Sequence, residues 1–404
     1  MPFENGFSQV SRRSFLHFSA AASTIAALRV MTEPMLAEAA ARAIPADANP
    51  KNAVWIDSNE NPLGPCSAAR QAAIAIVGQG GRYLLGRTDD FEKTFAQSEG
   101  LKPEYVRAFP GSSGPLQHSV LAYTSPTRSY VTADPGYEAG MEAASVSGAR
   151  IVKVTLTKSH AHDAKAMLAA APDAGLFYIC TPNNPTGTLT SHSDIEFLVE
   201  NKPKGSMVVV DEAYIHFAGV PSVVDLVNAE KDVIVLRTFS KLYGLAGLRC
   251  GVAIARPDVL TKIQNMVGWN AMPITGVAAA SASLAEVHLV SERKHINAEV
   301  RGEVFQWLDQ HGYSYIPSEA NFFMLDTKRP AQTVINAMAQ RNVRIGRIWP
   351  SMPTYSRITV GTREEMLAFR EEFDRVMKAA VTSRASKSEN PPAWRSLDGM
   401  RIRA

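Results

Sequence analysis

Cysteine is scarce in this chain. The 404 residues include three cysteines, Cys66, Cys180 and Cys250, and no two of them form a C-x-x-C pair. An odd, scattered set argues against a framework of disulfide bridges, and without a C-x-x-C pair we expect no cysteine metal site and no bound metal. Cys180 and Cys250 lie in apolar, strand-like runs, which is typical of buried and inert thiols.

The chain also lacks a strong excess of charge of either sign. The formal net charge is +3, and residues 381–404 alone carry five basic and two acidic side chains. The rest of the chain is therefore nearly neutral, so nothing favours a nucleic-acid partner. The same end segment contains Ser and Pro with little periodicity, and we predict a disordered tail over residues 381–404.

Long apolar runs are missing as well. The best candidate, residues 18–28, is too short and too rich in alanine for a stable membrane span. It follows the hexapeptide at residues 11–16, Ser-Arg-Arg-Ser-Phe-Leu, and small-residue A-x-A sites follow it at residues 37–39 and 41–43. This order resembles a bacterial twin-arginine export signal.

From that resemblance we predict a signal peptide over residues 1–43 and a periplasmic or otherwise exported protein. The alternative is an ordinary amphipathic N-terminal helix with a chance arginine pair, which would leave the protein in the cytoplasm. In either case we expect no stable membrane span in the mature protein.

Apolar, β-branched runs alternate with helical stretches through the middle of the chain. Continuous apolar strands separated by helices favour an α/β fold with a mostly parallel sheet, covered by helices on both faces. The predicted strands are Tyr130–Ala133, Ile151–Leu156, Leu176–Thr181, Met207–Asp211, Val233–Thr238 and Cys250–Ala255. We predict an N-terminal arm with a first helix (44–80), a large domain (81–272) and a smaller C-terminal α+β domain (273–380).

Polar residues follow three of these strands, at 181–187, 211–214 and 240–241, where ligands of parallel sheets bind. A lysine held among apolar neighbours, as Lys241 is here, can lose its proton and attack a carbonyl carbon. Ser240 before it and Arg249 eight positions later can hold a phosphate. Aldehyde capture beside phosphate binding is what pyridoxal 5′-phosphate (PLP) requires, although a glycine-rich loop with solvated charges is the alternative for this stretch alone.

Several short motifs occur in an order that resembles the fold-type I PLP-dependent aminotransferases, most closely the histidinol-phosphate aminotransferase group. The resemblance extends over residues 52–380 and predicts a large PLP-binding domain. Its motifs are Asn59-Glu60-Asn61-Pro62, Arg82-Tyr83, the Gly/Ser loop 111–114, Asn183–Gly187, Asp211–Tyr214, Ser240-Lys241 with Arg249, and Arg357–Thr362.

The resemblance assigns roles at the reacting end of the cofactor. Lys241 would bind PLP as a Schiff base and later carry the proton of the reacting carbon. Asp211 would pair with the protonated pyridine nitrogen, although an Asp at a strand end is often only a cap. Asn184 and Tyr214 would hydrogen-bond the ring hydroxyl oxygen. Tyr137 would stack on the ring face, with a plain core tyrosine as the alternative.

The phosphate would be held by the backbone N–H groups of Ser112 and Ser113, by Ser240 and by Arg249. The resemblance also implies that Tyr83 reaches the phosphate of the neighbouring subunit, so that the active unit is a homodimer.

On the substrate side, the resemblance assigns Arg357 to the α-carboxylate of the substrate, or to the group in its place, and Asn61 to the substrate entrance. The implied activity is a ping-pong transfer of an amino group from a small-molecule donor to a 2-oxo acid. A PLP-dependent decarboxylase or lyase of the same fold, and a non-enzymatic PLP-binding protein, are the alternatives. The motifs leave the donor open, and we predict that it has changed from histidinol phosphate to a free amino acid, because a phosphorylated internal metabolite does not suit an exported enzyme.

Overall fold

The structure, a computed structural model, describes residues 53–268 and 271–382. The predicted signal peptide and the part of the predicted tail from residue 383 onward lie outside the described residues. The first elements are β1 (Val54–Ile56), α3 (Ser67–Ile76), η2 (Val77–Gln79), α4 (Leu85–Ser98), η3 (Pro103–Tyr105), β2 (Val106–Phe109), α5 (Ser113–Tyr123), β3 (Ser129–Asp134), α6 (Ala139–Val146), β4 (Ile151–Thr155), α7 (Ala164–Ala170) and β5 (Ala174–Cys180).

The chain continues through the second half of the large sheet and into the small domain. These elements are α8 (His192–Asn201), β6 (Met207–Asp211), η4 (Ile215–Phe217), α9 (Val224–Asn228), β7 (Val233–Thr238), η5 (Ala246–Leu248), β8 (Gly251–Ile254), α10 (Pro257–Gln264), α11 (Ile274–Ala285), α12 (Leu289–Gln310), β9 (Ser314–Ile316), β10 (Phe322–Asp326), α13 (Ala331–Ala339), β11 (Val343–Ile345), β12 (Tyr355–Thr359) and α14 (Arg363–Thr382).

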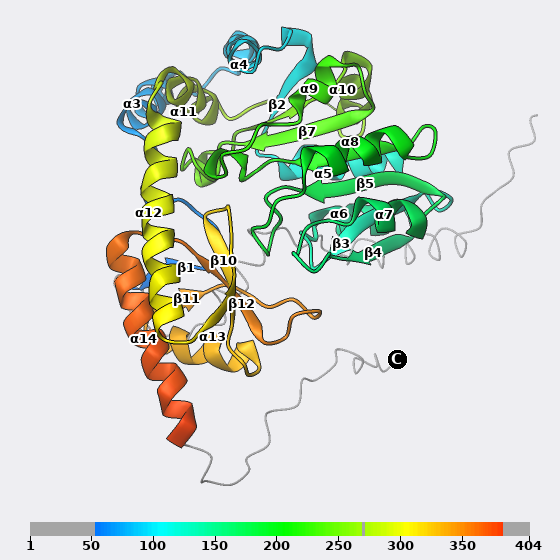
Figure 1. Cartoon of the computed structure of the whole chain (residues 1–404). Coiled ribbons are helices and arrows are strands. Elements are labelled where there is room, and N and C mark those ends of the chain that lie inside the picture. The colour runs from blue at the N-terminus through cyan, green and yellow to red at the C-terminus, as the bar shows by residue number, and fades with distance from the viewer. Residues whose placement is uncertain (1–52, 269–270, 383–404) are drawn as a thin grey trace, which may run out of the picture.

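A seven-stranded sheet in the order β2-β8-β7-β6-β5-β3-β4 forms the centre of the large domain (Figure 1). Only β8 runs against its neighbours, pairing antiparallel with β7 and β2. The predicted mostly parallel α/β fold is therefore confirmed. The direction of β8 was not predicted, because a buried strand has the same apolar run in either direction. The short strand β2 was not predicted either.

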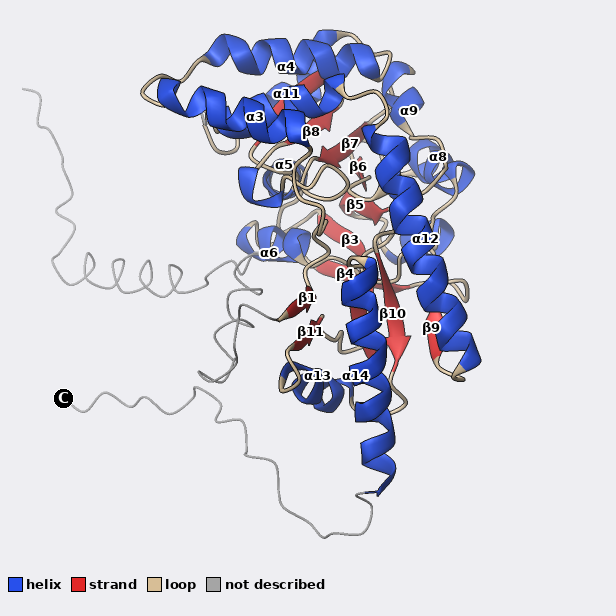
Figure 2. Ribbon diagram, turned by 90° about the vertical axis from the view of Figure 1, so that its left-hand side faces the viewer, coloured by secondary structure: helices blue, strands red, loops and turns tan. Residues whose placement is uncertain are grey.

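Helices cover both faces of this sheet, as Figure 2 shows. The reason is that successive side chains of a strand point to opposite faces of the sheet. In β6, Val208 and Val210 belong to the core on one face, whereas Met207 and Val209 belong to the core on the other. All five residues of β6 are buried, so a helix layer is needed on each side.

The small domain contains the antiparallel sheet β12-β10-β9 and the parallel pair β1-β11. The long helix α12 runs from the large domain along this one (Figure 1). Since β1 pairs with β11, the segment predicted as a separate N-terminal arm contributes a strand to the small domain.

At the start of α14, the Glu365 carboxylate accepts from the Thr362 N–H at 2.7 Å, and the Thr362 hydroxyl accepts from the Glu365 N–H at 3.2 Å. This capping box begins the helix directly after β12.

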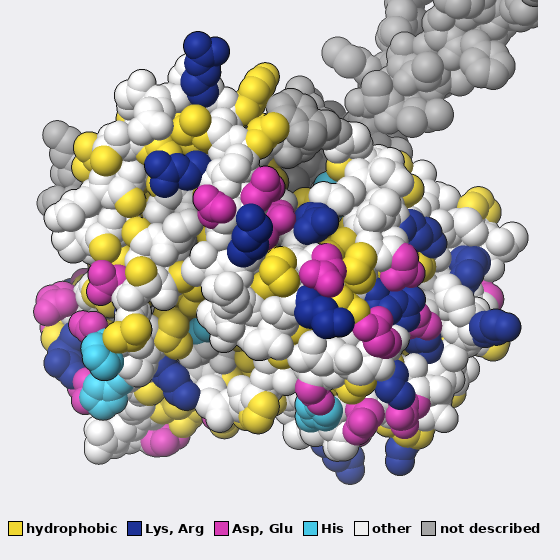
Figure 3. All heavy atoms as spheres, turned by 90° about the horizontal axis from the view of Figure 1, so that it is seen from above, with side chains coloured by type: hydrophobic (Ala, Val, Ile, Leu, Met, Phe, Trp, Pro, Cys, Tyr) yellow, Lys and Arg dark blue, Asp and Glu magenta, His cyan; other side chains and the backbone are white. Residues whose placement is uncertain are grey.

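Large apolar side chains reach the surface at the end of the molecule formed by α3, α4 and α11. Figure 3 views this end from above and shows hydrophobic side chains among charged ones. Ile74, Val77, Tyr83 and Leu85 are all about half exposed or more.

Within the described ranges no single helix has the length and apolar composition to cross a membrane. Helices α11 and α12 meet that criterion only as a pair, which is bent by 87°.

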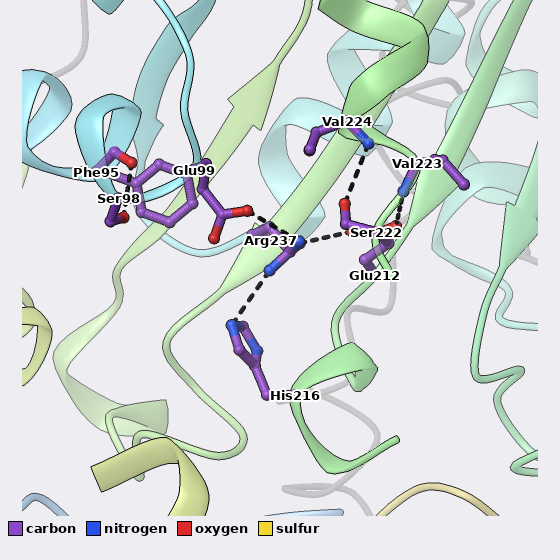
Figure 4. A network of polar contacts seen from close by, with 9 residues as sticks. All are labelled: Phe95, Ser98, Glu99, Glu212, His216, Ser222, Val223, Val224 and Arg237. Carbon is purple, nitrogen blue, oxygen red and sulfur yellow. Dashed lines mark hydrogen bonds and ion pairs between the residues drawn. The ribbon is translucent and has the colours of Figure 1, made fainter. Parts of the chain in front are cut away.

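A buried ionic network joins the ends of β6 and β7 (Figure 4). The Nε of Arg237 donates to the Glu212 carboxylate at 2.7 Å, and its Nη2 lies 3.4 Å from a Glu99 carboxylate oxygen. Burial acts to lower the pKa of Arg237, but Glu212 and Glu99 more than offset this and raise it. Burial and then Arg237 lower the pKa of His216 to about 3, so the neutral ring accepts from Arg237 Nη1 at 3.2 Å. The network holds in place the residues next to Asp211 and Thr238.

Candidate active site

Three neighbouring parallel strands end at one edge of the large sheet. β5 ends at Cys180, β6 at Asp211 and β7 at Thr238, and all three residues line a cavity of about 310 Å³. This is the edge at which parallel sheets bind ligands. The predicted site residues in the cavity wall are Ser112, Ser113, Tyr137, Asn184, Asp211, Tyr214, Ser240, Lys241 and Arg249.

Lys241 lies in the turn after β7, with its side chain buried. Its Nζ donates to the Ser58 carbonyl oxygen at 3.3 Å and lies 5.7 Å from the centre of the Tyr214 ring. The turn closes with a hydrogen bond from the Gly244 N–H to the Lys241 carbonyl at 3.1 Å. Gly244 has φ +69°, and a Cβ there would lie 2.2 Å from the Gly64 carbonyl oxygen. Glycine is therefore required for the turn that directs Lys241 inward.

The Asp211 carboxylate is held by two donors. The Tyr178 hydroxyl donates to its Oδ2 at 2.9 Å, and the Ala213 N–H donates to its Oδ1 at 3.1 Å. Burial and then the Asp211 charge raise the pKa of Tyr178 well above its usual value, so the hydroxyl keeps its proton. Tyr178, which the sequence analysis missed, thus orients a buried carboxylate in the cavity wall. Its position within an apolar strand gave no signal of this role.

Arg249 lies in the cavity wall and supplies positive charge there. Its Nη2 donates to the Pro110 carbonyl at 3.2 Å, and its Nη1 donates to the Ala246 carbonyl at 2.9 Å and lies 3.5 Å from the Ser240 hydroxyl. A Cβ on Gly111 would lie 2.2 Å from Arg249 Nη2. Only glycine lets the loop before α5 approach the guanidinium this closely.

The N-terminus of α5 completes this positive region. The helix begins at Ser113, and Ser112 is its N-cap. Pro115 does not interrupt it, because the N–H groups of a first turn have no partner within the helix. Those N–H groups and the helix dipole favour an anion. The Ser113 hydroxyl lies 3.2 Å from the Tyr137 hydroxyl, which places Tyr137 beside the same region.

Arg357, on β12 of the small domain, is almost fully buried. Its Nη1 donates to Asn184 Oδ1 at 2.8 Å, and its Nη2 donates to the Asp57 carbonyl at 2.8 Å. The guanidinium also lies over the rings of Phe322 and Trp349, 5.6 and 5.5 Å from their centres. Because Oδ1 of Asn184 accepts from Arg357, its Nδ2 is the group that can donate elsewhere.

Three predicted site residues lie outside the cavity wall: Arg357, which contacts it through Asn184 as described above, Asn61 and Tyr83. Asn61 Nδ2 donates to the Leu242 carbonyl at 2.7 Å, and Asn61 Oδ1 accepts from the Leu63 N–H at 3.1 Å. Its side chain supports the backbone next to Lys241, and its predicted place at the substrate entrance stays a prediction. Tyr83 lies between η2 and α4 and is 67% exposed, so it does not reach the cavity of its own chain.

The sequence analysis also missed Asn59. This residue is fully buried, and its Nδ2 donates to the Tyr214 hydroxyl at 3.1 Å. The motif Asn59-Glu60-Asn61-Pro62 did indicate this loop. However, nothing in the sequence distinguishes which of the two asparagines faces the cavity residues.

The residues in the wall fit PLP. Ser112, Ser240, Arg249 and the α5 N-terminus form a donor set for a phosphate dianion. The Asp211 carboxylate suits a protonated ring nitrogen, and Lys241 suits an aldehyde. Among residues 53–268 and 271–382, no group of three or more His, Cys, Asp or Glu side chains could hold a metal ion.

Known proteins resemble this chain over most of its length. A family model described as aminotransferase class I and II matches residues 51–373. Histidinol-phosphate aminotransferase of Moorella thermoacetica is 34% identical over 327 residues, 79% of this chain and 84% of the relative. Aromatic amino acid aminotransferase of Cutibacterium acnes is 32% identical over 303 residues, 74% of this chain and 86% of the relative.

Among solved structures, histidinol-phosphate aminotransferase from Sinorhizobium meliloti in complex with pyridoxal-5′-phosphate superposes with a TM-score of 0.74. It is 25% identical in sequence, and the match covers 80% of this chain and 91% of that one. The chain therefore belongs to the class I and II aminotransferases. It is a PLP-dependent transaminase, as predicted, that moves an amino group between an amino compound and a 2-oxo acid.

The chemistry can be divided among the residues of the wall. PLP supplies an aldehyde that takes up the amino group and a ring that withdraws electrons from the reacting carbon. Lys241 Nζ would hold the cofactor and would then take and return the proton at the reacting carbon. The Asp211 carboxylate would keep a proton on the ring nitrogen. The Tyr214 hydroxyl and Asn184 Nδ2 would donate to the ring hydroxyl oxygen.

Replacing the lysine tests this division directly. We expect Lys241→Ala to abolish turnover, because the buried amine that moves the proton is lost, while the phosphate donors still bind PLP weakly. Absorbance of the bound cofactor with and without an amino donor measures both effects. Lys153→Ala, on the exposed side of β4, is the control and should behave as the wild type. Near-normal transamination by Lys241→Ala would refute the assignment.

Proposed function

We propose that the amino donor is a free amino acid rather than a phosphorylated amine. The observation that carries this proposal is the buried guanidinium of Arg357, bonded to Asn184 of the cavity wall at 2.8 Å. Arginine binds carboxylates through two parallel hydrogen bonds. A free amino acid has a carboxylate next to its reacting amine, as the 2-oxo acid has next to its carbonyl, so Arg357 would serve both substrates in the same way, whereas histidinol phosphate has no carboxylate.

The charges around Arg357 support the same donor. Arg347 and Arg357 both lie over the ring of Trp349, 4.5 and 5.5 Å from its centre. Arg347 Nη2 is 2.6 Å from a Glu138 carboxylate oxygen. A phosphate near this ring would therefore compete with Glu138 for Arg347, whereas a carboxylate needs Arg357 alone.

The N-terminal sequence gives an independent argument. The Arg12-Arg13 pair and the small-residue exit after it are typical of twin-arginine export. An exported enzyme would meet free amino acids more readily than a phosphorylated internal metabolite. One relative, the aromatic amino acid aminotransferase of Cutibacterium acnes, is named for such a donor. We therefore also propose that the mature enzyme works in the periplasm or outside the cell.

A panel of single donors tests the substrate proposal. The PLP-loaded enzyme is mixed, without an acceptor, with histidinol phosphate, glutamate, or an aromatic, aliphatic or basic amino acid. We expect one or more free amino acids to convert the absorbance of the bound cofactor to that of its aminated form, with the 2-oxo acid identified by mass. Conversion by histidinol phosphate above all others would contradict the proposal, and release of carbon dioxide would indicate the decarboxylase alternative.

A fluorescent reporter fused to residues 1–50 tests export. We expect the fusion to leave the cytoplasm, and we expect replacement of Arg12 and Arg13 by lysine to keep it inside, because the pathway recognises the arginine pair. The lysine variant is thus the matched control. Retention of the reporter whether or not the arginine pair is present would eliminate the export proposal.

We also propose that the active unit is a homodimer in which Tyr83 completes the partner's phosphate site. Tyr83 is exposed and lies outside the cavity of its own chain, as described above. Ile74 of α3, Val77 of η2 and Leu85 of α4, which lie near Tyr83 in the sequence, are exposed as well. Exposed apolar side chains grouped with a polar anchor of this kind suit a contact between two copies.

Complementation between two variants tests the shared site. We expect Tyr83→Ala to weaken PLP binding and Lys241→Ala to be inactive. Mixed dimers, formed by co-expression, contain one site with both defects and one with neither, so about a quarter of all sites should regain normal PLP affinity and turnover. Mixing two separately purified homodimers without exchange is the control. No recovery in co-expressed mixed dimers would place Tyr83 outside the neighbouring site.

A further inference from the structure

Asn59 connects the two domains beside the cofactor cavity. It comes shortly after β1, and its side chain meets Tyr214, which follows β6 in the large domain, and Thr359, the last residue of β12 in the small domain. Thr359 is two residues after Arg357, the residue assigned to the substrate carboxylate. Asn59 is therefore the link between the strand that carries Arg357 and the hydroxyl of Tyr214.

The polar atoms of Asn59 are all used in this link. Its N–H donates to Thr359 Oγ1 at 2.9 Å, and its Oδ1 accepts from the same hydroxyl at 3.2 Å. Its carbonyl accepts from Asn321 Nδ2 at 3.1 Å. The fourth contact is the donation from Nδ2 to Tyr214. The backbone has φ +54°, a conformation that asparagine adopts more readily than most residues.

These contacts determine the direction of the Tyr214 hydroxyl. An amide Nδ2 can only donate, so the Tyr214 oxygen must accept from Asn59. The phenolic proton of Tyr214 cannot serve that contact and has to point to another acceptor. Tyr214 lines the cavity together with Lys241 and Asp211, and the ring oxygen of the cofactor is an acceptor that this wall is built to receive.

We propose that Asn59 is a positioning residue that directs the Tyr214 proton toward the cofactor, and that Thr359 holds Asn59 in the required orientation. A proton donated to the ring oxygen stabilises negative charge on it. The Nζ of Lys241, which would lie beside that oxygen when it holds the cofactor, would then bind its own proton less tightly. Losing the Asn59 contact should therefore raise the pH at which the absorbance of the bound cofactor changes.

Two substitutions at Asn59 distinguish its effect on the direction of the Tyr214 proton from its effect on packing. Asn59→Asp keeps the shape but replaces the donor by an acceptor, so that Tyr214 would donate to the new carboxylate instead of the cofactor. Asn59→Gly removes the side chain and tolerates the positive φ. We expect the absorbance midpoint, measured on the PLP-loaded enzyme without substrate, to rise by about one pH unit for Asn59→Asp and by less for Asn59→Gly.

A second pair of variants tests the connection to the small domain. Thr359→Val removes the hydroxyl that orients Asn59, whereas Thr359→Ser keeps it. We expect the valine variant to raise the midpoint and the serine variant to leave it unchanged. This pair also keeps the proposal testable if the Asn59 variants fold poorly, with the thermal unfolding midpoint as the check on folding. Equal behaviour of the two Thr359 variants would overturn the role of Thr359.

A double-mutant cycle with Tyr214→Phe decides whether Asn59 acts through Tyr214. In the Tyr214→Phe background the phenolic proton is already absent, so Asn59→Gly should produce no further shift of the midpoint. Additive shifts would mean that Asn59 acts by general electrostatics or packing, and would overturn the proposal. The measurement needs no amino donor, so its outcome is independent of the substrate and export proposals.

Discussion

The parallel register of β5, β6 and β7 is the constraint on which the rest of this protein depends. Cys180 of β5 pairs with Asp211 of β6, and Asp211 pairs with Leu236 of β7. The three strands therefore end at nearly the same level, and the turns that follow them start from one edge. Asn184 and Lys241 are 57 positions apart in the chain. They come together with Asp211 only because of this register.

The small domain supplies the other half of the site. Arg357 comes from β12, and the loop with Asp57 and Asn59 follows β1, which pairs with β11. These elements share a hydrophobic core with α14, including Ile56, Ile345 and Phe369. Packing in that core therefore determines where the Arg357 guanidinium and Asn59 lie relative to the cavity, where they contact Asn184 and Tyr214, respectively.

Two buried charged groups in and beside this site are paired, as charges must be where water is excluded. The Asp211 carboxylate has Tyr178 and a backbone N–H, and the Arg237 guanidinium has Glu212 and His216 (Figure 4). A buried polar group that lacks some of its hydrogen bonds would cost folding free energy and would not be held in one position. This pairing gives the Asp211 carboxylate a fixed position, which pre-organises it for the cofactor.

Most of the fold could be predicted from the sequence, because buried parallel strands read as continuous apolar runs. Met207–Asp211 and Val233–Thr238 were predicted with the boundaries that the structure shows. The reversed strand β8, the short β2 and the pairing of β1 with β11 were not. Strand direction and long-range pairing leave no local pattern in an apolar run, and strands of three or four residues, such as β1 and β2, are too short to show a period.

For the site, the sequence by itself determined the chemistry: a lysine, an aspartate, an arginine and a Gly/Ser loop, at spacings that suit PLP. Only the tertiary structure decided how these groups are oriented. It placed Asn59 rather than Asn61 against Tyr214, put Tyr178 on Asp211, and left Tyr83 facing outward. The physical reason is that side-chain hydrogen bonds form between segments 33 to 300 residues apart, and their partners are chosen by packing, which no local spacing encodes.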